Sequence, residues 1–182
     1  MALVTLGCQV LVASTFAVAA ISKRPGKAFA EFTKSTGLLL PSLAGGWRRP
    51  VALGVFAAEL AVVVLTLLPA TVAAGFALAT VTTAGFTIAI TAALRRGERA
   101  PCRCFGAGGT PLGPVHLARN LVLIVVAVAG LLAALLSPAG PTEPALAVVT
   151  VIAALTVASL VIRMDDLVAL FAPSPYHPNK SK

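Results

Sequence analysis

The chain has 182 residues, of which 58% are hydrophobic and only 11% are charged, and its mean hydropathy is +0.97. A soluble domain carries about a quarter charged residues, so this composition excludes an ordinary soluble protein. The net charge of +8 would suggest a nucleic-acid partner in a soluble protein. Here the basic residues lie between long apolar runs, where they orient the chain in a bilayer. We therefore predict an all-α integral membrane protein that binds no nucleic acid.

Five apolar runs are long enough to cross a membrane as helices, since each span needs roughly 20 residues. We expect these helices over residues 3–21, 51–68, 71–94, 115–136 and 145–162. The short connection at Pro69 makes the second and third helices an antiparallel hairpin. Together the helices predict one domain over residues 1–171, followed by a flexible, proline-containing tail over residues 172–182.

The connection between the first two spans, residues 22–50, is polar and basic. Phe29, Phe32 and Leu38–Leu40 give it an intermittent apolar face, which is consistent with a short helix lying in the membrane interface. We favour a membrane-hugging loop over this helix. In either case Trp47 is expected to anchor the segment at the level of the lipid headgroups.

The basic residues predict the orientation of the chain. Five spans put the first connection, the segment after the third span and the C-terminus on one face, and all fourteen Lys and Arg residues fall there. The positive-inside rule makes this face cytoplasmic and places the N-terminus outside the cell membrane.

The most reactive side chains lie in the connection between the third and fourth spans, over residues 95–114. Cys102 and Cys104 stand one residue apart there, with Arg99 and Arg103 beside them. Positive charge and a nearby helix N-terminus both favour the thiolate form of cysteine. A disulfide between residues two apart closes a small ring with little freedom to relax, so it should be readily reduced. This pattern favours a redox-active pair.

Two other interpretations of the pair remain. Zinc or copper could bind Cys102 and Cys104 together with His116, although zinc sites usually space their first two cysteines further apart and no fourth ligand is evident. The pair could also be inert. We predict no metal site. Cys8 stands alone near the opposite end of the first span, where we expect it to pack as a small hydrophobic residue.

Two features of the spans could also carry function. Glu59 lies in the middle of the second span, where an ionisable group is costly and therefore a candidate functional residue, or a hydrogen-bonded link between helices. The third span carries Thr80, Thr83, Thr87 and Thr91 along one face. Hydroxyls in membrane helices most often bond their own backbone or a neighbouring helix, and the alternative is that they line a site.

Polar residues also open the fourth span. His116, Arg119 and Asn120 lie within its first two turns, with His116 and Asn120 on the same face. Helix capping and contact with headgroups are the ordinary roles of such residues. Their position shortly after the cysteines makes them candidates for supporting the pair.

Three short elements resemble a known family: the run Leu94–Gly97, the Cys-Arg-Cys-Phe-Gly motif at Cys102–Gly106, and the run Leu117–Leu121. Further marks of the resemblance are Lys23, Pro25, Phe29, Phe32 and Glu59. On these residues the chain resembles the MauE branch of the DoxX-like membrane proteins, over roughly residues 14–123.

This resemblance implies a compact bundle of four transmembrane helices, here with a fifth C-terminal helix, and a role in the redox maturation of exported proteins. MauE proteins are tied to the biogenesis of methylamine dehydrogenase and work beside a thioredoxin-like partner. The family's motif cysteines correspond to Cys102 and Cys104, and Phe105 and Gly106 complete the motif. The methylamine substrate does not carry over.

We therefore expect Cys102 and Cys104 to exchange electrons with a thioredoxin-like partner or a membrane quinone. No flavin, haem or nucleotide motif is visible, so a quinone is the cofactor that the sequence leaves open. The charge rule places the pair in the cytoplasm, whereas disulfide supply to exported proteins would place it outside, so the direction of electron flow stays open. The alternatives are a small transporter that uses Glu59 and the threonine face, and a non-catalytic assembly factor.

Overall fold

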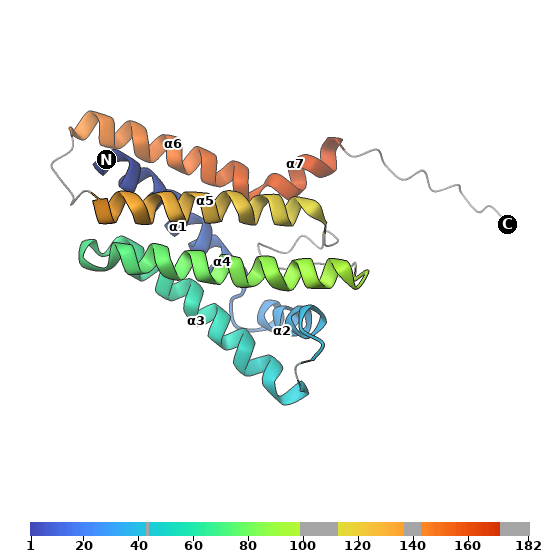
Figure 1. Ribbon diagram of the computed structural model, residues 1–182. Helices are drawn as coiled ribbons and strands as arrows, with labels where there is room; N and C mark the ends of the chain where they lie inside the picture. Colours follow the sequence, from blue (N-terminus) through green and yellow to red (C-terminus); the bar gives the residue numbers. More distant parts are fainter. Residues whose placement is uncertain (43, 99–112, 137–142, 172–182) are drawn as a thin grey trace.

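The computed structural model describes residues 1–42, 44–98, 113–136 and 143–171, and every regular element among them is helical (Figure 1). The elements are α1 (Ala2–Ser22), α2 (Lys27–Leu39), α3 (Arg48–Leu67), α4 (Val72–Arg95), α5 (Pro114–Leu136), α6 (Pro144–Ile162) and α7 (Met164–Phe171), with short 3-10 turns at Gly45–Trp47 and Pro69–Thr71. Five of them, α1, α3, α4, α5 and α6, are long and apolar enough to cross a membrane. The expected all-α membrane fold with five spans is therefore confirmed.

The first helix, α1, contacts all four of the other long apolar helices. It packs against α3, α5 and α6 and also touches α4. Its Val12 and Phe16 join Val62 of α3 and Phe76 of α4 in the main buried cluster. Cys8 packs against the same cluster, in line with the small hydrophobic residue expected there. α6 reaches the bundle mainly through α1 and leaves its other sides to the surface.

The α3–α4 hairpin is closed tightly at one end and open at the other. Near the turn at Pro69–Thr71, Gly75 lies so close to α3 that a Cβ atom on it would be 2.7 Å from the backbone nitrogen of Thr66. From this crossing the two helices diverge, and α2 lies between them at the open end (Figure 1). Small residues at helix crossings allow this close approach in membrane bundles.

The segment after the first span is a helix, α2, and the membrane-hugging loop that we favoured from the sequence is wrong. The helix begins after Gly26, whose φ of 114° suits glycine. Phe32 is buried, and Phe29 meets Phe56 of α3 edge-on with ring centroids 6.3 Å apart. The intermittent apolar face therefore finds partners in α3 and α4, and contact with them makes the helical form stable. Trp47 is exposed, as a headgroup anchor requires.

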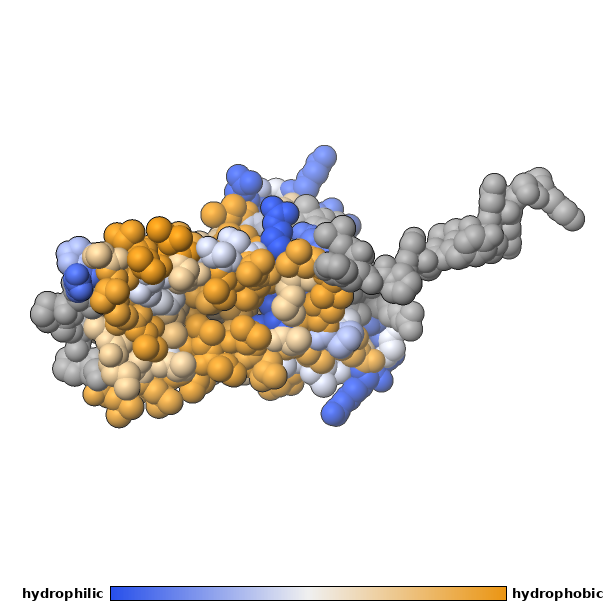
Figure 2. Space-filling model, turned by 90° about the horizontal axis from the view of Figure 1, so that it is seen from above, coloured by the Kyte–Doolittle hydropathy of each residue, from blue (hydrophilic) through white to orange (hydrophobic). Residues whose placement is uncertain are grey.

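The outer surface of the bundle is mainly apolar. In Figure 2 the hydrophobic side chains cover most of the long body, and most strongly polar side chains gather toward the end at which α2 and α7 lie. A lipid environment suits the first surface and an aqueous boundary suits the second.

Candidate functional site

Several polar and charged side chains are buried inside the described part of the bundle. They are Thr15, Lys23, Ser35, Thr36, Glu59, Thr66, Thr83, His116, Arg119 and Asn120. Charged groups are costly in a membrane bundle unless they are paired, so the ionisable members of this set are the first candidates for function.

Lys23 and Glu59 form a buried ion pair. Lys23 Nζ lies 2.7 Å from Glu59 Oε1, and the two side chains are 1% and 2% exposed. The same ammonium donates to the Ala19 carbonyl at 3.2 Å and lies 5.0 Å from the centre of the Phe32 ring. A cation over an aromatic face is stabilised by the ring quadrupole. Residues from α2 and α3 thus converge on one charge that follows α1.

This pair changes the interpretation of two residues. From the sequence, one role open to Glu59 is a hydrogen-bonded link between helices, and the structure pairs it with Lys23. Lys23 was counted among the loop cations that orient the chain, yet it is 1% exposed. The signal that could have found the pair is simple: a buried carboxylate requires a cation, and Lys23 directly follows a span that packs against α3.

A small cavity of about 10 Å³ lies beside Glu59. Its other lining residues are Phe16, Ala19, Thr83, Phe86, Asn120 and Leu123. This volume is close to the smallest that holds one water molecule. Glu59 Oε2 is buried and has no hydrogen-bond partner among the described residues. The cavity therefore places an acceptor on α3 beside polar side chains of α4 and α5.

The four threonines that were predicted to share one face of α4 divide into two groups. The hydroxyls of Thr80, Thr87 and Thr91 donate to the carbonyls four residues earlier, at 2.9, 2.8 and 2.7 Å. This is the ordinary bonding of hydroxyls inside membrane helices. Thr83 is buried, and it is the one of these four threonines that lines the small cavity beside Glu59.

A second polar cluster joins the start of α5 to the start of α7. Arg119 Nη1 lies 2.6 Å from Asp165 Oδ2, and His116 Nε2 lies 3.8 Å from the same oxygen. Arg119 is 1% exposed and Asp165 is 15% exposed. Asp165 stands in the first turn of α7, where the helix dipole also favours a carboxylate. This cluster fixes α7 against α5.

Asp165 differs from its charged neighbours in the chain. Arg163 and Asp166 are 74% and 62% exposed, and Arg163 Nη1 lies 3.6 Å from Asp166 Oδ2. Asp165 instead faces Arg119, because α7 begins immediately after α6 and turns one side back onto α5.

The two polar clusters meet on α5. His116 and Asn120 are one turn apart and both are buried. Asn120 lines the cavity beside Glu59, while His116 lies near Asp165. The structure thus brings together four of the predicted site residues, namely Glu59, His116, Arg119 and Asn120, along one buried polar path. Sequence reasoning missed the acidic and basic partners, Asp165 and Lys23.

The remaining predicted site residues lie outside the described residues. These are Arg99, Cys102, Arg103, Cys104, Phe105 and Gly106. The chain positions on either side of them are held in place. Arg96 Nη2, after α4, donates to the Leu39 carbonyl at 2.8 Å, and Arg119, in α5, is held by Asp165.

The comparisons with known proteins identify the family. No curated protein and no solved structure matches the chain. The family model described as methylamine utilisation protein MauE matches residues 1–134. The matched range includes Lys23, Glu59, the cysteine motif and the polar start of α5. The chain therefore belongs to the MauE family of membrane proteins.

Proposed function

We propose that this protein is a membrane thiol–disulfide oxidoreductase, in which Cys102 and Cys104 exchange electrons with a thioredoxin-like protein during the maturation of exported proteins. The observation that carries the proposal is that the family match spans both cysteines together with the buried polar residues that follow them in α5. In the family's namesake the exported protein that is matured belongs to methylamine utilisation. Exported proteins of that kind are the first candidates to test as clients of this protein.

The proposed thiol–disulfide exchange has two steps. In the reduced pair, the thiolate of one cysteine attacks a sulfur of the partner's disulfide, forming a mixed disulfide and releasing one partner thiolate. The second cysteine then attacks the mixed disulfide, so that the pair becomes a disulfide and the partner a dithiol. Two electrons pass to the partner, whose thiolates take up the protons. The reverse sequence oxidises the partner.

The surrounding charges support this chemistry. Arg103 lies between the two cysteines in the sequence and Arg99 shortly before them, and positive charge raises the thiolate fraction of a neighbouring cysteine. The flanking anchors at Arg96 and Arg119 hold the two helices from which the segment departs and to which it returns. A fixed position of the helix ends limits where the pair can meet its partner.

Single-cysteine variants test the proposal. In a Cys8→Ser background, Cys102→Ser and Cys104→Ser each leave one motif cysteine, and the variant that keeps the attacking cysteine should accumulate a mixed disulfide with a thioredoxin-fold protein. The adduct is detected in cells by non-reducing electrophoresis and mass spectrometry, and it should disappear with reductant. The Cys8→Ser parent is the control. The proposal fails if neither variant forms an adduct and labelling of the thiols by maleimide is unchanged by reduction.

A second candidate function, ion- or proton-coupled transport, is favoured by one observation. Glu59 Oε2 lacks a hydrogen-bond partner among the described residues, and Glu59 lines a water-sized cavity inside the bundle. This function predicts that Glu59→Gln abolishes activity while Cys102→Ser and Cys104→Ser are tolerated. The redox function predicts the reverse dependence on the cysteines. A non-catalytic assembly factor would tolerate all three substitutions as long as the protein still inserts.

A further inference from the structure

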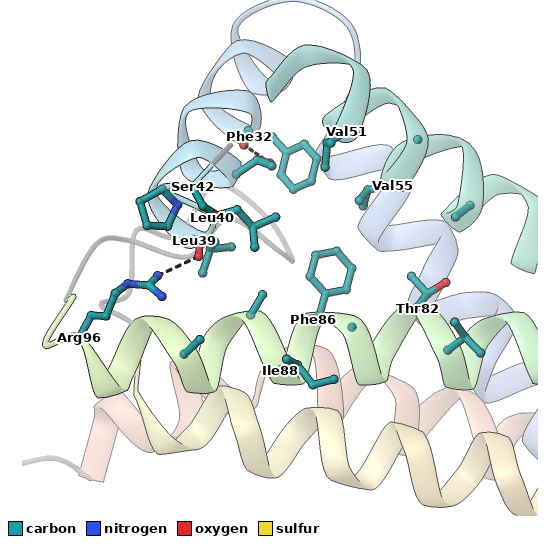
Figure 3. A pocket seen from close by; sticks show the side chains of 18 residues that line it. Phe32, Leu39, Leu40, Ser42, Val51, Val55, Thr82, Phe86, Ile88 and Arg96 are labelled. Carbon is teal, nitrogen blue, oxygen red and sulfur yellow. Dashed lines mark hydrogen bonds between the residues drawn. The ribbon is translucent and has the colours of Figure 1, made fainter. Parts of the chain in front are cut away.

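A large apolar cavity lies where α3 and α4 diverge, on the side of α4 that faces α2 and α3 (Figure 3). Its volume is about 790 Å³, within the range of roughly 300–1,000 Å³ that is usual for small-molecule sites. Phe32 of α2, Val55 of α3 and Phe86 of α4 extend into it (Figure 3). It is a separate space from the small cavity beside Glu59.

Glycines keep this space open. Gly54 of α3 and Gly85 of α4 both line the cavity, and a Cβ atom added to either one would meet nothing within 4 Å. By contrast, a Cβ on Gly75 or Gly130 would lie 2.7 or 2.5 Å from an atom of a neighbouring helix. Those two glycines serve helix packing, whereas Gly54 and Gly85 border space that the protein leaves unfilled.

One end of the cavity is cationic. Arg96 lines it and extends along the end of α2, where Nη2 donates to the Leu39 carbonyl at 2.8 Å (Figure 3). A guanidinium carries five N–H donors, and Leu39 is its hydrogen-bond partner among the described residues. Arg48 lies near the same end of α2, since a Cβ on Gly37 would be 2.8 Å from its Nε atom. The cavity thus joins an apolar slot to a positively charged rim.

We propose that this cavity binds one anionic phospholipid, with its phosphate on Arg96 and an acyl chain between α3 and α4 against Phe32 and Phe86. Charge complementarity carries the choice of ligand. Arginine matches phosphate oxygens with paired, charge-assisted hydrogen bonds, and basic residues at the boundary of a membrane helix attract anionic lipids. A neutral amphiphile such as a quinone would gain nothing from the charge of the rim.

The test is lipid binding to the full-length protein, purified in detergent and stripped of lipid. Native mass spectrometry then follows titration with phosphatidylglycerol and with diacylglycerol, which carries the same acyl chains but no phosphate. We expect phosphatidylglycerol to bind at least about tenfold more tightly, the size that charge-assisted hydrogen bonds predict. Arg96→Gln should remove most of this preference, and Arg96→Lys should keep part of it. Arg95→Gln, the neighbouring exposed arginine outside the lining, is the matched control and should leave the preference unchanged.

The slot is tested separately from the rim. Gly85→Leu should weaken the binding of both lipids, because its side chain enters the cavity without a backbone clash. Ala57→Leu, on the exposed surface of α3 and outside the lining, is the control. Gly54→Leu repeats the test from the opposite wall if Gly85→Leu does not yield folded protein by gel filtration.

The proposal is overturned if phosphatidylglycerol and diacylglycerol bind equally, or if Arg95→Gln and Arg96→Gln cause equal losses. It is also overturned if both glycine substitutions leave binding unchanged, or if an isoprenoid quinone displaces phosphatidylglycerol independently of Arg96. Glycerol phosphate, which has the head group without acyl chains, should bind far more weakly. Equal binding of glycerol phosphate would assign the rim to free phosphate and would also overturn the lipid site.

Discussion

The ammonium of Lys23 and the carboxylate of Glu59 are almost completely removed from solvent. Taking two charges out of water is costly, and their attraction offsets this cost only while both are present. Removal of one partner leaves the other charge buried, so the pair acts as a constraint on the relative positions of α1, α2 and α3. The Phe32 ring adds a third contact to the same ammonium.

A double-mutant cycle tests this constraint. Glu59→Gln and Lys23→Met should each lower the free energy of unfolding by about 3–5 kcal/mol, because each leaves an unpaired buried charge or a carboxylate without its cation. The double variant should lose clearly less than the sum. Thermal and denaturant unfolding in detergent, followed by circular dichroism, measures the four proteins.

The control for this cycle is Glu143→Gln. Glu143 is exposed at the start of α6 and makes no side-chain capping bond, so its substitution should change stability by less than about 0.5 kcal/mol. Strictly additive losses in the cycle would show that Lys23 and Glu59 do not stabilise one another.

At the scale of helices, the two ends of the α3–α4 hairpin differ in their packing. A Cβ atom on Gly75 would lie 2.7 Å from atoms of Thr66, whereas a Cβ atom on Gly85 would meet nothing within 4 Å. The same residue type therefore supports a close crossing at one position and an open cavity at the other. Substitution by alanine separates these two roles.

Gly75→Ala should destabilise the protein by about 1–3 kcal/mol, because the new methyl group would overlap the backbone of α3 and force the helices apart. Gly85→Ala should be neutral or stabilising by up to about 1 kcal/mol, since alanine favours the helix and meets empty space. Melting temperatures of the two variants, measured side by side in one detergent, test these two expected changes in stability. A destabilised Gly85→Ala together with a neutral Gly75→Ala would contradict this account of the hairpin.

Asp165 joins the last helix, α7, to Arg119 of α5. Asp165→Asn should weaken the bond to Arg119 and reduce stability by about 1.5–3 kcal/mol, the usual worth of a hydrogen bond to a charged group. Asp166→Asn is the matched control, because its pair with Arg163 is exposed and worth less than about 1 kcal/mol. Limited proteolysis should cut α7 faster in Asp165→Asn. Equal cleavage of both variants would mean that α7 is held in another way.

At the scale of the whole molecule, the described charges gather toward the end of the bundle that carries α2 and α7 (Figure 2). Lys23 and Arg119 differ from the other cations, because both are buried and form ion pairs. The other cations still favour a cytoplasmic location for this end by the positive-inside rule. The cysteine segment departs from the end of α4 and returns to the start of α5, so its side of the membrane follows from this orientation.

Reporter fusions test the orientation. Green fluorescent protein fused after Lys182 should fluoresce, and alkaline phosphatase fused at the same position should be inactive, since the C-terminus is expected in the cytoplasm. A Cys8→Ser protein should react with an impermeant maleimide only after permeabilisation of the cells. Active phosphatase together with labelling of intact cells would place Cys102 and Cys104 outside. The proposed redox function would then supply disulfides to exported proteins directly.

Much of the fold and part of the site could be predicted from the sequence. The five spans follow from length and hydropathy, because lipid leaves no partner for an open backbone and only long apolar helices satisfy it. Glu59, His116, Arg119 and Asn120 were predicted as site residues because polar groups inside spans are costly and therefore conspicuous, and the structure shows that all four are buried. These are local properties, readable from one stretch of chain at a time.

The tertiary structure alone decided which groups meet. The pair of Lys23 with Glu59 joins residues 36 positions apart, and the pair of Arg119 with Asp165 joins residues 46 positions apart. The intermittent apolar pattern of α2 fits either a loop or a helix until α3 and α4 supply its partners. The cavity at Gly54 and Gly85 depends on the angle at which two helices diverge. Such features arise from packing between distant segments, which no local pattern contains.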